Sequence, residues 1–220
     1  MTVAGRWPEP TVANELEAKL TVPDGFALPT LVGVGPVASA SSADVVLDAQ
    51  YWDTADLALV RMGVTVRRRT GESTVARWTV KVPASVDRAG LLDRREMDVD
   101  DDASSPPDAV VALVGDVLDD VTLVPSARLI TRRTTVTLRD EAGGVVAEVA
   151  DDDVVVHVGG VETERFREVE VEAGPVDPDG VALAAVVVAL RAQGGDDADP
   201  TPKVAYALRH RLTHGSENPT

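Results

Sequence analysis

Alternation of polar and apolar residues runs through most of the chain and predicts a β-rich fold. In residues 15–20, three charged residues alternate with three apolar ones, so the charged side chains share one face of a predicted strand. Further segments show the same alternation and also have a charged face, and counting them predicts about eight strands. The other predicted strands lie in residues 45–52, 64–70, 75–82, 92–99, 128–138, 144–151 and 166–172.

The period changes to that of a helix in three segments, which cover residues 106–119, 178–193 and about 203–212. Asp177 precedes the second segment as a candidate helix cap. We therefore expect an α+β fold, an eight-stranded antiparallel closed β-barrel with a charged lumen and helices packed outside. A single domain is expected over residues 12–213, with a flexible arm at 1–11 and a flexible tail at 214–220.

Composition narrows the possible functions. The 220 residues suffice for one core, and the absence of cysteine excludes disulfides and thiolate metal sites. The net charge of -16 argues against binding to nucleic acid polymers or anionic membranes, although a small polyanion can bind where basic residues gather. No basic leader precedes an apolar run, and Val181 to Leu190 is too short to span a bilayer, so a soluble, cytoplasmic protein is expected.

The charged strand faces supply two sets of residues with complementary chemistry. Convergent Arg and Lys side chains suit a ligand with many phosphate oxygens, and carboxylates beside phosphates require divalent cations between them. The pattern therefore indicates a site for a metal-phosphate complex. The cationic set is Lys19, Arg67, Arg69, Lys81, Arg94, Arg133 and Lys203. The anionic set is Glu15, Glu17, Glu96, Glu148, Asp151, Asp153, Glu168 and Glu170, with Glu172 as a further candidate.

The order of these motifs resembles the CYTH family, also called triphosphate tunnel metalloenzymes. The family begins with E-x-E-x-K, which is similar to Glu15, Glu17 and Lys19 here, and the resemblance extends over roughly residues 13 to 212. Its specificity lies in the ordered set rather than in any single motif. The later segments that match are Tyr51–Thr54, Gly63, R-x-R at Arg67 and Arg69, Lys81 with Pro83, R-x-E at Arg94 and Glu96, Arg133 with Arg132 as the alternative, the acidic run Asp151 to Asp153, E-x-E at Glu168 and Glu170, and Lys203.

The resemblance implies a tunnel that binds a linear triphosphate and one or two Mg²⁺ or Mn²⁺ ions. It assigns catalysis to Lys19, Glu17 and Glu170. Substrate binding falls to Lys19, Arg67, Arg69, Lys81, Arg94, Arg133 and Lys203. The metal ligands would be Glu15, Glu17, Glu168 and Glu170, with Asp151 or Asp153.

Three functions remain open at this point. The first is metal-dependent hydrolysis of inorganic tripolyphosphate or an organic triphosphate such as thiamine triphosphate. The second is a class IV type adenylate cyclase that makes cAMP from ATP, and the third is a noncatalytic module that binds polyphosphate or a phosphorylated nucleotide. The intact carboxylate motifs favour catalysis over binding alone. The expected partner is a small polyphosphorylated molecule, the expected state is a monomer or homodimer, and no CHAD domain is expected.

Overall fold

The computed structural model describes residues 11–71, 73–86, 92–115, 118, 122–198 and 201–214. The side chains of 11–15, 84–86, 92–94 and 214 are outside this description. The predicted arm and tail lie outside the described residues except for Thr11 and His214. None of the described helices is long and apolar enough to cross a membrane.

Strands dominate the described chain, as the alternating pattern predicts. The strands are β1 (Thr11–Thr21), β2 (Ser39–Asp53), β3 (Thr65–Thr70), β4 (Arg77–Val86), β5 (Leu92–Asp100), β6 (Val124–Arg139), β7 (Val145–Val158), β8 (Val161–Ala173) and β9 (Asp196–Asp197). The helices are α1 (Ala58–Arg61), α2 (Asp108–Gly115), α3 (Val181–Ala192), α4 (Lys203–Ala207) and α5 (Arg209–His214). The single helix expected at 203–212 is therefore two short helices, with Leu208 between them.

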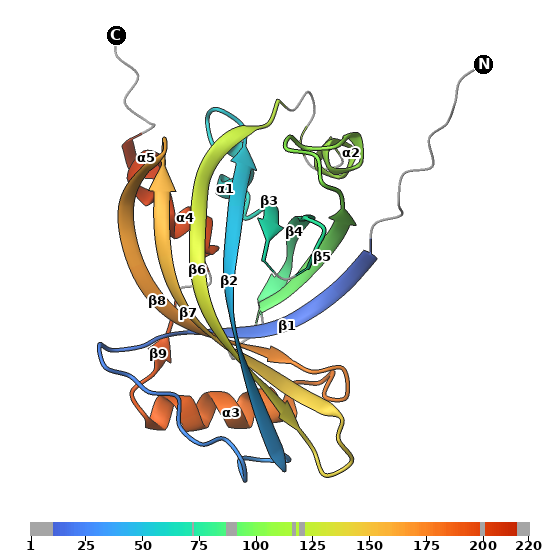
Figure 1. Ribbon diagram of the computed structural model, residues 1–220, viewed down its shortest axis with the longest axis vertical. Coiled ribbons are helices and arrows are strands. Elements are labelled where there is room, and N and C mark those ends of the chain that lie inside the picture. The colour runs from blue at the N-terminus through green and yellow to red at the C-terminus, as the bar shows by residue number, and fades with distance from the viewer. Residues whose placement is uncertain are drawn as a thin grey trace, which may run out of the picture.

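Antiparallel pairing joins all the described strands into one sheet, in the order β5-β4-β3-β2-β6-β7-β8-β1-β9, and β1 also pairs with β5 (Figure 1). The prediction of an antiparallel α+β fold is confirmed, but the eight-stranded closed barrel is not. The sheet has nine strands because β9 pairs with the end of β1. The sheet is also not closed along its length, because β1 contacts the two neighbouring strands with different parts of its own length. It pairs with β5 over Thr11–Glu17 and with β8 over Glu17–Thr21. The two ladders therefore overlap only at Glu17.

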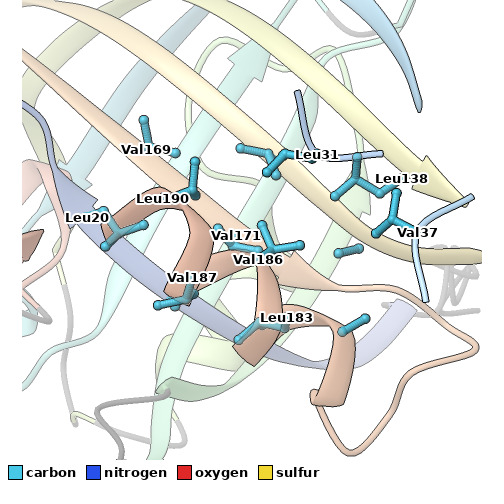
Figure 2. Packing of buried hydrophobic residues seen from close by; sticks show 14 of the residues in the cluster. Leu20, Leu31, Val37, Leu138, Val169, Val171, Leu183, Val186, Val187 and Leu190 are labelled. Atoms are coloured by element: carbon cyan, nitrogen blue, oxygen red, sulfur yellow. The ribbon is translucent and has the colours of Figure 1, made fainter. Parts of the chain in front are cut away.

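One face of the sheet carries the largest apolar cluster, which α3 covers. Val169 and Val171 of β8 are fully buried there, against Leu183 and Val186 of α3 (Figure 2). Since side chains alternate along a strand, Glu170 and Glu172, which alternate with these valines, project to the opposite face. Burial of the valines thus fixes the direction of the glutamates.

Two further clusters cover other parts of the sheet. Val66, Trp78 and Val80 of β3 and β4 pack with residues of α2. The other cluster joins Tyr51 to α4 and α5. Because Tyr51 also lines the central cavity described below, α4 packs on the cavity side of the sheet rather than outside it. This placement brings the start of α4 to the cavity and corrects the expectation that all helices pack outside.

Asp177 caps α3, as its sequence position predicts. Its carboxylate accepts hydrogen bonds from the backbone N–H groups of Val181, Ala182 and Leu183, at 3.0, 2.8 and 3.2 Å. These three donors have no partner within the helix, so the carboxylate satisfies groups that the helix leaves open.

Replacing Asp177 by Ala should lower the free energy of unfolding by about 1–2 kcal/mol, because the N–H groups lose their acceptor. Chemical denaturation in urea measures this change. The matched control is Asp179→Ala, which removes the same charge from an exposed position two residues later. Equal effects of the two substitutions would show that net charge, and not the cap, is responsible.

Candidate functional site

A cavity of about 460 Å³ lies within the curve of the sheet, and β1 to β8 all contribute to its wall. Charged side chains dominate the lining, so the polar strand faces of the sequence do converge. The start of α4 completes the wall. The charged lining residues are Glu17, Lys19, Arg67, Arg69, Arg77, Lys81, Glu96, Asp98, Arg133, Glu148, Glu170, Glu172 and Lys203.

Strand register sets the order of these groups along the wall. Glu17 of β1 stands opposite Glu172 of β8, and Lys19 stands opposite Glu170. On the other side of β8, Glu172 stands opposite Glu148 of β7. The carboxylates of β1, β7 and β8 therefore fall into two groups at different levels, apart from Glu96 and Asp98 of β5.

The first group consists of Asp152, Glu168 and Glu170, which we call the Lys203 cluster. Each offers a carboxylate oxygen, and these oxygens lie within 4.8 Å of one another. The ammonium of Lys203 lies 3.0 Å from Asp152, 2.5 Å from Glu168 and 2.6 Å from Glu170. One amine thus bridges three carboxylates.

Two more cations complete the Lys203 cluster. Arg133 donates two hydrogen bonds of 2.7 Å to Asp152 and lies 3.3 Å from Glu170. Lys19 lies 2.5 Å from Glu170. Burial alone would raise the pKa of Glu170, but Lys19, Lys203 and Arg133 hold that pKa well below its ordinary value. Burial would likewise lower the pKa of Lys203, but its three carboxylates hold that pKa well above its ordinary value.

The second group consists of Glu17, Glu148 and Glu172, which we call the Glu172 cluster. All three line the cavity at adjacent register positions of β1, β8 and β7. Glu148 accepts a 2.8 Å hydrogen bond from the hydroxyl of Thr137. Burial raises the pKa of Glu172, and the charges of Glu170 and Glu17 raise it further. Lys81 and Arg133 act in the opposite direction but leave the pKa of Glu172 raised.

Basic side chains from β3 and β4 line the wall opposite β8. Lys81 lies 2.5 Å from Glu96, and Arg67 lies 3.9 Å from the same carboxylate. Arg69 and Arg77 lie next to each other in the ladder between β3 and β4 and also line the cavity. The arrangement offers several cations to one anionic ligand, as the sequence predicts.

Two predicted metal ligands do not reach the cavity. On the outer face of the sheet, Asp151 accepts hydrogen bonds of 2.8 and 2.6 Å from Arg167 of β8. Asp151, Asp153 and Arg167 line a depression on that face. Asp152 faces the cavity instead, because β7 directs Glu148, Ala150 and Asp152 inward.

The remaining predicted residues either have a described position or have side chains that lie outside the described residues. Arg133 lines the cavity, whereas its alternative, Arg132, is exposed. Glu15 and Arg94 stand opposite each other in the ladder between β1 and β5, and their side chains lie outside the described residues. Two charged lining residues, Arg77 and Asp98, are absent from both charge sets of the sequence analysis. Strand alternation was a signal that could have found them, because Arg77 shares a face of β4 with Lys81 and Asp98 shares a face of β5 with Glu96.

All three lysines of the chain line this one cavity. They come from β1, β4 and α4, which are far apart in the sequence. Elsewhere in the sequence arginine is the only strongly basic side chain. Every lysine ammonium group of the sequence therefore belongs to a residue that lines the cavity.

A model of the CYTH domain matches residues 13–185. The chain belongs to the CYTH domain family. The CYTH match ends before α4, so Lys203 lies beyond the matched residues. The uncharacterized protein Rv2226 of Mycobacterium tuberculosis is 34% identical over 158 residues, which are 70% of this chain and 29% of that protein. The match thus spans less than a third of this relative's length.

Solved structures of CYTH-like proteins share the fold. HpAC1 from Hippeastrum, described as a candidate adenylyl cyclase with a dominant triphosphatase activity, has a TM-score of 0.57 at 15% identity. That alignment covers 93% of this chain and all 100% of HpAC1. A Bacillus halodurans protein described as a candidate adenylate cyclase has a TM-score of 0.55 at 17% identity, and the alignment covers 89% of this chain and 97% of that one.

Replacing Glu172 by Gln should raise the free energy of unfolding near neutral pH. The folded-state pKa of Glu172 lies above the ordinary 4.5, so its ionisation is less favourable in the folded state than in the unfolded chain. The ionised carboxylate therefore costs stability at a pH above its folded-state pKa, and this cost disappears where both states are protonated. Urea denaturation at about pH 7.5 and about pH 4 should show a gain at the higher pH alone.

Glu141→Gln is the control for this experiment, because Glu141 is exposed in the turn before β7 and loses the same charge. We expect little change from it at either pH. A Glu172 variant that is less stable than the wild type at about pH 7.5 would contradict the raised pKa.

Proposed function

We propose that the chain hydrolyses a linear triphosphate with the help of a divalent metal ion, inside a tunnel formed by β1 to β8. The observation that carries this proposal is the single cavity in which cations from β1, β3, β4, β6 and α4 face carboxylates from β1, β5, β7 and β8. A ligand that satisfies both sets must combine many anionic oxygens with a metal ion. A metal-bound triphosphate has this composition.

Binding of the phosphate chain falls to the basic wall. Arg67 and Arg69 present planar guanidinium groups that can donate two hydrogen bonds to one phosphate, whereas Lys81 acts as a point charge. The strand backbone and partners such as Glu96 hold these groups in place before the ligand arrives. Little reorganisation is then needed on binding, which favours an electrostatic contribution to catalysis.

Carboxylate oxygens are the ligands that Mg²⁺ and Mn²⁺ prefer, so both acidic clusters have suitable chemistry. Glu17, Glu172 and Glu148 would hold a metal at the Glu172 cluster, and Asp152, Glu168 and Glu170 would do so at the Lys203 cluster. When bound, the metal ion supplies neutralisation of phosphate charge and a lowered pKa for coordinated water.

Lys19 is proposed as the catalytic cation closest to the reacting phosphate. Its ammonium is directed by Glu170, 2.5 Å away, and its side chain is 5% exposed. Phosphoryl transfer requires mostly positioning and charge stabilisation from the protein. Lys19 would donate to an oxygen of the transferred group, and Glu170 would keep the amine oriented.

Cleavage of ATP to cAMP is the competing reaction and requires a platform for the adenine base. Among the described lining residues, Tyr51 is the one aromatic side chain, and it also packs against the apolar cluster at α4. The polarity of the rest of the wall therefore favours an inorganic or largely phosphate substrate over a nucleotide.

The deciding experiment measures orthophosphate, pyrophosphate and cAMP released from tripolyphosphate and from ATP, with Mg²⁺, with Mn²⁺ and with chelator. We expect orthophosphate from tripolyphosphate, lost on chelation, because a divalent ion would neutralise phosphate charge beside the carboxylates of the cavity. cAMP with pyrophosphate from ATP would establish the cyclase. Tight binding of tripolyphosphate without turnover would establish the noncatalytic module.

A neighbouring pair of arginines tests the basic wall. Arg67→Met should lower kcat/KM for tripolyphosphate about tenfold to a hundredfold, through loss of a charge-assisted hydrogen bond. Arg68→Met should change it less than about twofold, because Arg68 donates to the backbone oxygens of Ala103 and Asp102 and does not line the cavity. Similar losses in both variants would contradict the assigned strand face.

A further inference from the structure

A buried carboxylate away from the cavity wall holds the turn that leads into α1. Asp53, at the end of β2, is 3% exposed and is not among the described lining residues of the cavity. Its Oδ1 accepts hydrogen bonds from the backbone N–H groups of Thr54 and Leu59, at 2.7 and 2.9 Å. Its Oδ2 accepts a third, of 3.1 Å, from the N–H group of Val60. Buried N–H groups that lose their acceptor destabilise a fold, so Asp53 fixes the path of the chain into α1.

The backbone of this turn has an unfavourable conformation that its surroundings must impose. Leu57, which is 3% exposed, has a φ of 61°, and no other described residue except glycine has a positive φ. Residues with a Cβ rarely adopt this left-handed conformation, and it persists only where neighbouring interactions enforce it. The hydroxyl of Thr54 contributes, because it accepts a 2.8 Å hydrogen bond from the N–H group of Ala58. Asp53 and Thr54 together therefore specify how α1 is presented to the rest of the protein.

α1 and the turn before it form the surface on which α4 packs. Leu57 and Val60 are buried in the same apolar cluster as Val204, Ala205 and Ala207 of α4, and α1 lies against α4. α4 has five residues, and no side chain in the described part of the chain caps it, so it has little stability of its own. Packing in this cluster must therefore hold α4 in place.

The first residue of α4 is Lys203, whose side chain enters the cavity. Its ammonium lies 3.0 Å from Asp152, 2.5 Å from Glu168 and 2.6 Å from Glu170. Charge-assisted contacts of this length weaken with small displacements, so all three require a defined position for the start of α4. A shift of α1 would move α4 and weaken the three contacts together.

We propose that Asp53 is a positioning residue for Lys203. Through the backbone N–H groups of Leu59 and Val60 it fixes α1, and α1 in turn fixes where α4 places the ammonium. This inference rests on the proposed function only for the role of Lys203 in binding the phosphate chain. Substrate binding then depends on a carboxylate that does not reach the cavity.

The test compares the rates at which an amine-reactive reagent modifies the lysines of the folded protein, measured by mass spectrometry with no metal or phosphate compound added. Amines react in the uncharged form, and the carboxylates around Lys203 hold its pKa well above the ordinary value, so it should react slowly in the wild type. Asp53→Asn replaces one acceptor oxygen by an NH₂ group, which cannot accept. Lys203 should then react about fivefold faster or more, while Lys81 on β4 stays within about twofold of its wild-type rate.

Asp177→Asn is the matched control, because Asp177 also accepts hydrogen bonds from three backbone N–H groups but holds α3. It should leave the ratio of the Lys203 rate to the Lys81 rate within about twofold of the wild type. An unchanged ratio in folded Asp53→Asn, or equal acceleration of both lysines, overturns the proposal. Circular dichroism and thermal melting establish whether each variant is folded.

Thr54→Val covers the case in which Asp53→Asn does not fold. It keeps the size of the side chain and removes the acceptor for the N–H group of Ala58. The rate ratio of Lys203 to Lys81 should rise about twofold or more, because α1 is held less firmly. A ratio equal to that of the wild type contradicts the proposal.

Turnover of tripolyphosphate supplies a second readout once the proposed hydrolysis is confirmed. Asp53→Asn should raise KM about as much as Lys203→Met does. In the Lys203→Met background it should change KM less than about twofold, because its effect passes through the lysine. Additive losses would show that Asp53 acts independently of Lys203. The labelling experiment contains no turnover step, so failure of the proposed hydrolysis leaves its outcome unaffected.

Discussion

The structure depends on strands whose two faces are both committed. On β8, Val169 and Val171 are buried under α3, while Glu170 and Glu172, which alternate with them, face the cavity. A slip of one residue would place carboxylates in the apolar layer and valines in the charged cavity, so both faces enforce the same register. Precision in the site therefore comes from the apolar packing outside it.

Enclosure of so many charges requires each to have compensation nearby. Asp152 and Glu170 have it from Arg133 and two lysines, which hold their pKa values below the ordinary range. Buried ion pairs of this kind add little net stability, since desolvation offsets their attraction. What they provide is orientation: the amines and guanidinium groups stand in fixed places before any phosphate arrives. At Glu172 the cost of burial prevails over Lys81 and Arg133, and the pKa is raised.

Local periodicity explains which parts of the site were predictable from sequence. The inward faces of β1, β3 and β4 follow from alternation alone, so Glu17, Lys19, Arg67, Arg69 and Lys81 could be placed. In the run Asp151 to Asp153, charged residues do not alternate with apolar ones, so the sequence does not show which aspartate faces the cavity. Packing of the neighbouring Val149 in the cluster under α3 decides this.

Strand register and the extent of sheet closure depend on residues far apart in the chain, so neither could be predicted from the sequence. Glu168, Glu170 and Glu172 have the same parity, so only the pairing of β1 with β8 shows that Glu172 stands beside Glu17. The ninth strand and the position of α4 depend likewise on tertiary packing.

The confinement of all three lysines to the cavity has a practical consequence for chemical labelling. Apart from the N-terminal amine, reagents that attach dyes, cross-linkers or solid supports to amino groups have targets only where the ligand is proposed to bind, so such labelling would modify the interior and leave the outer surface unmarked.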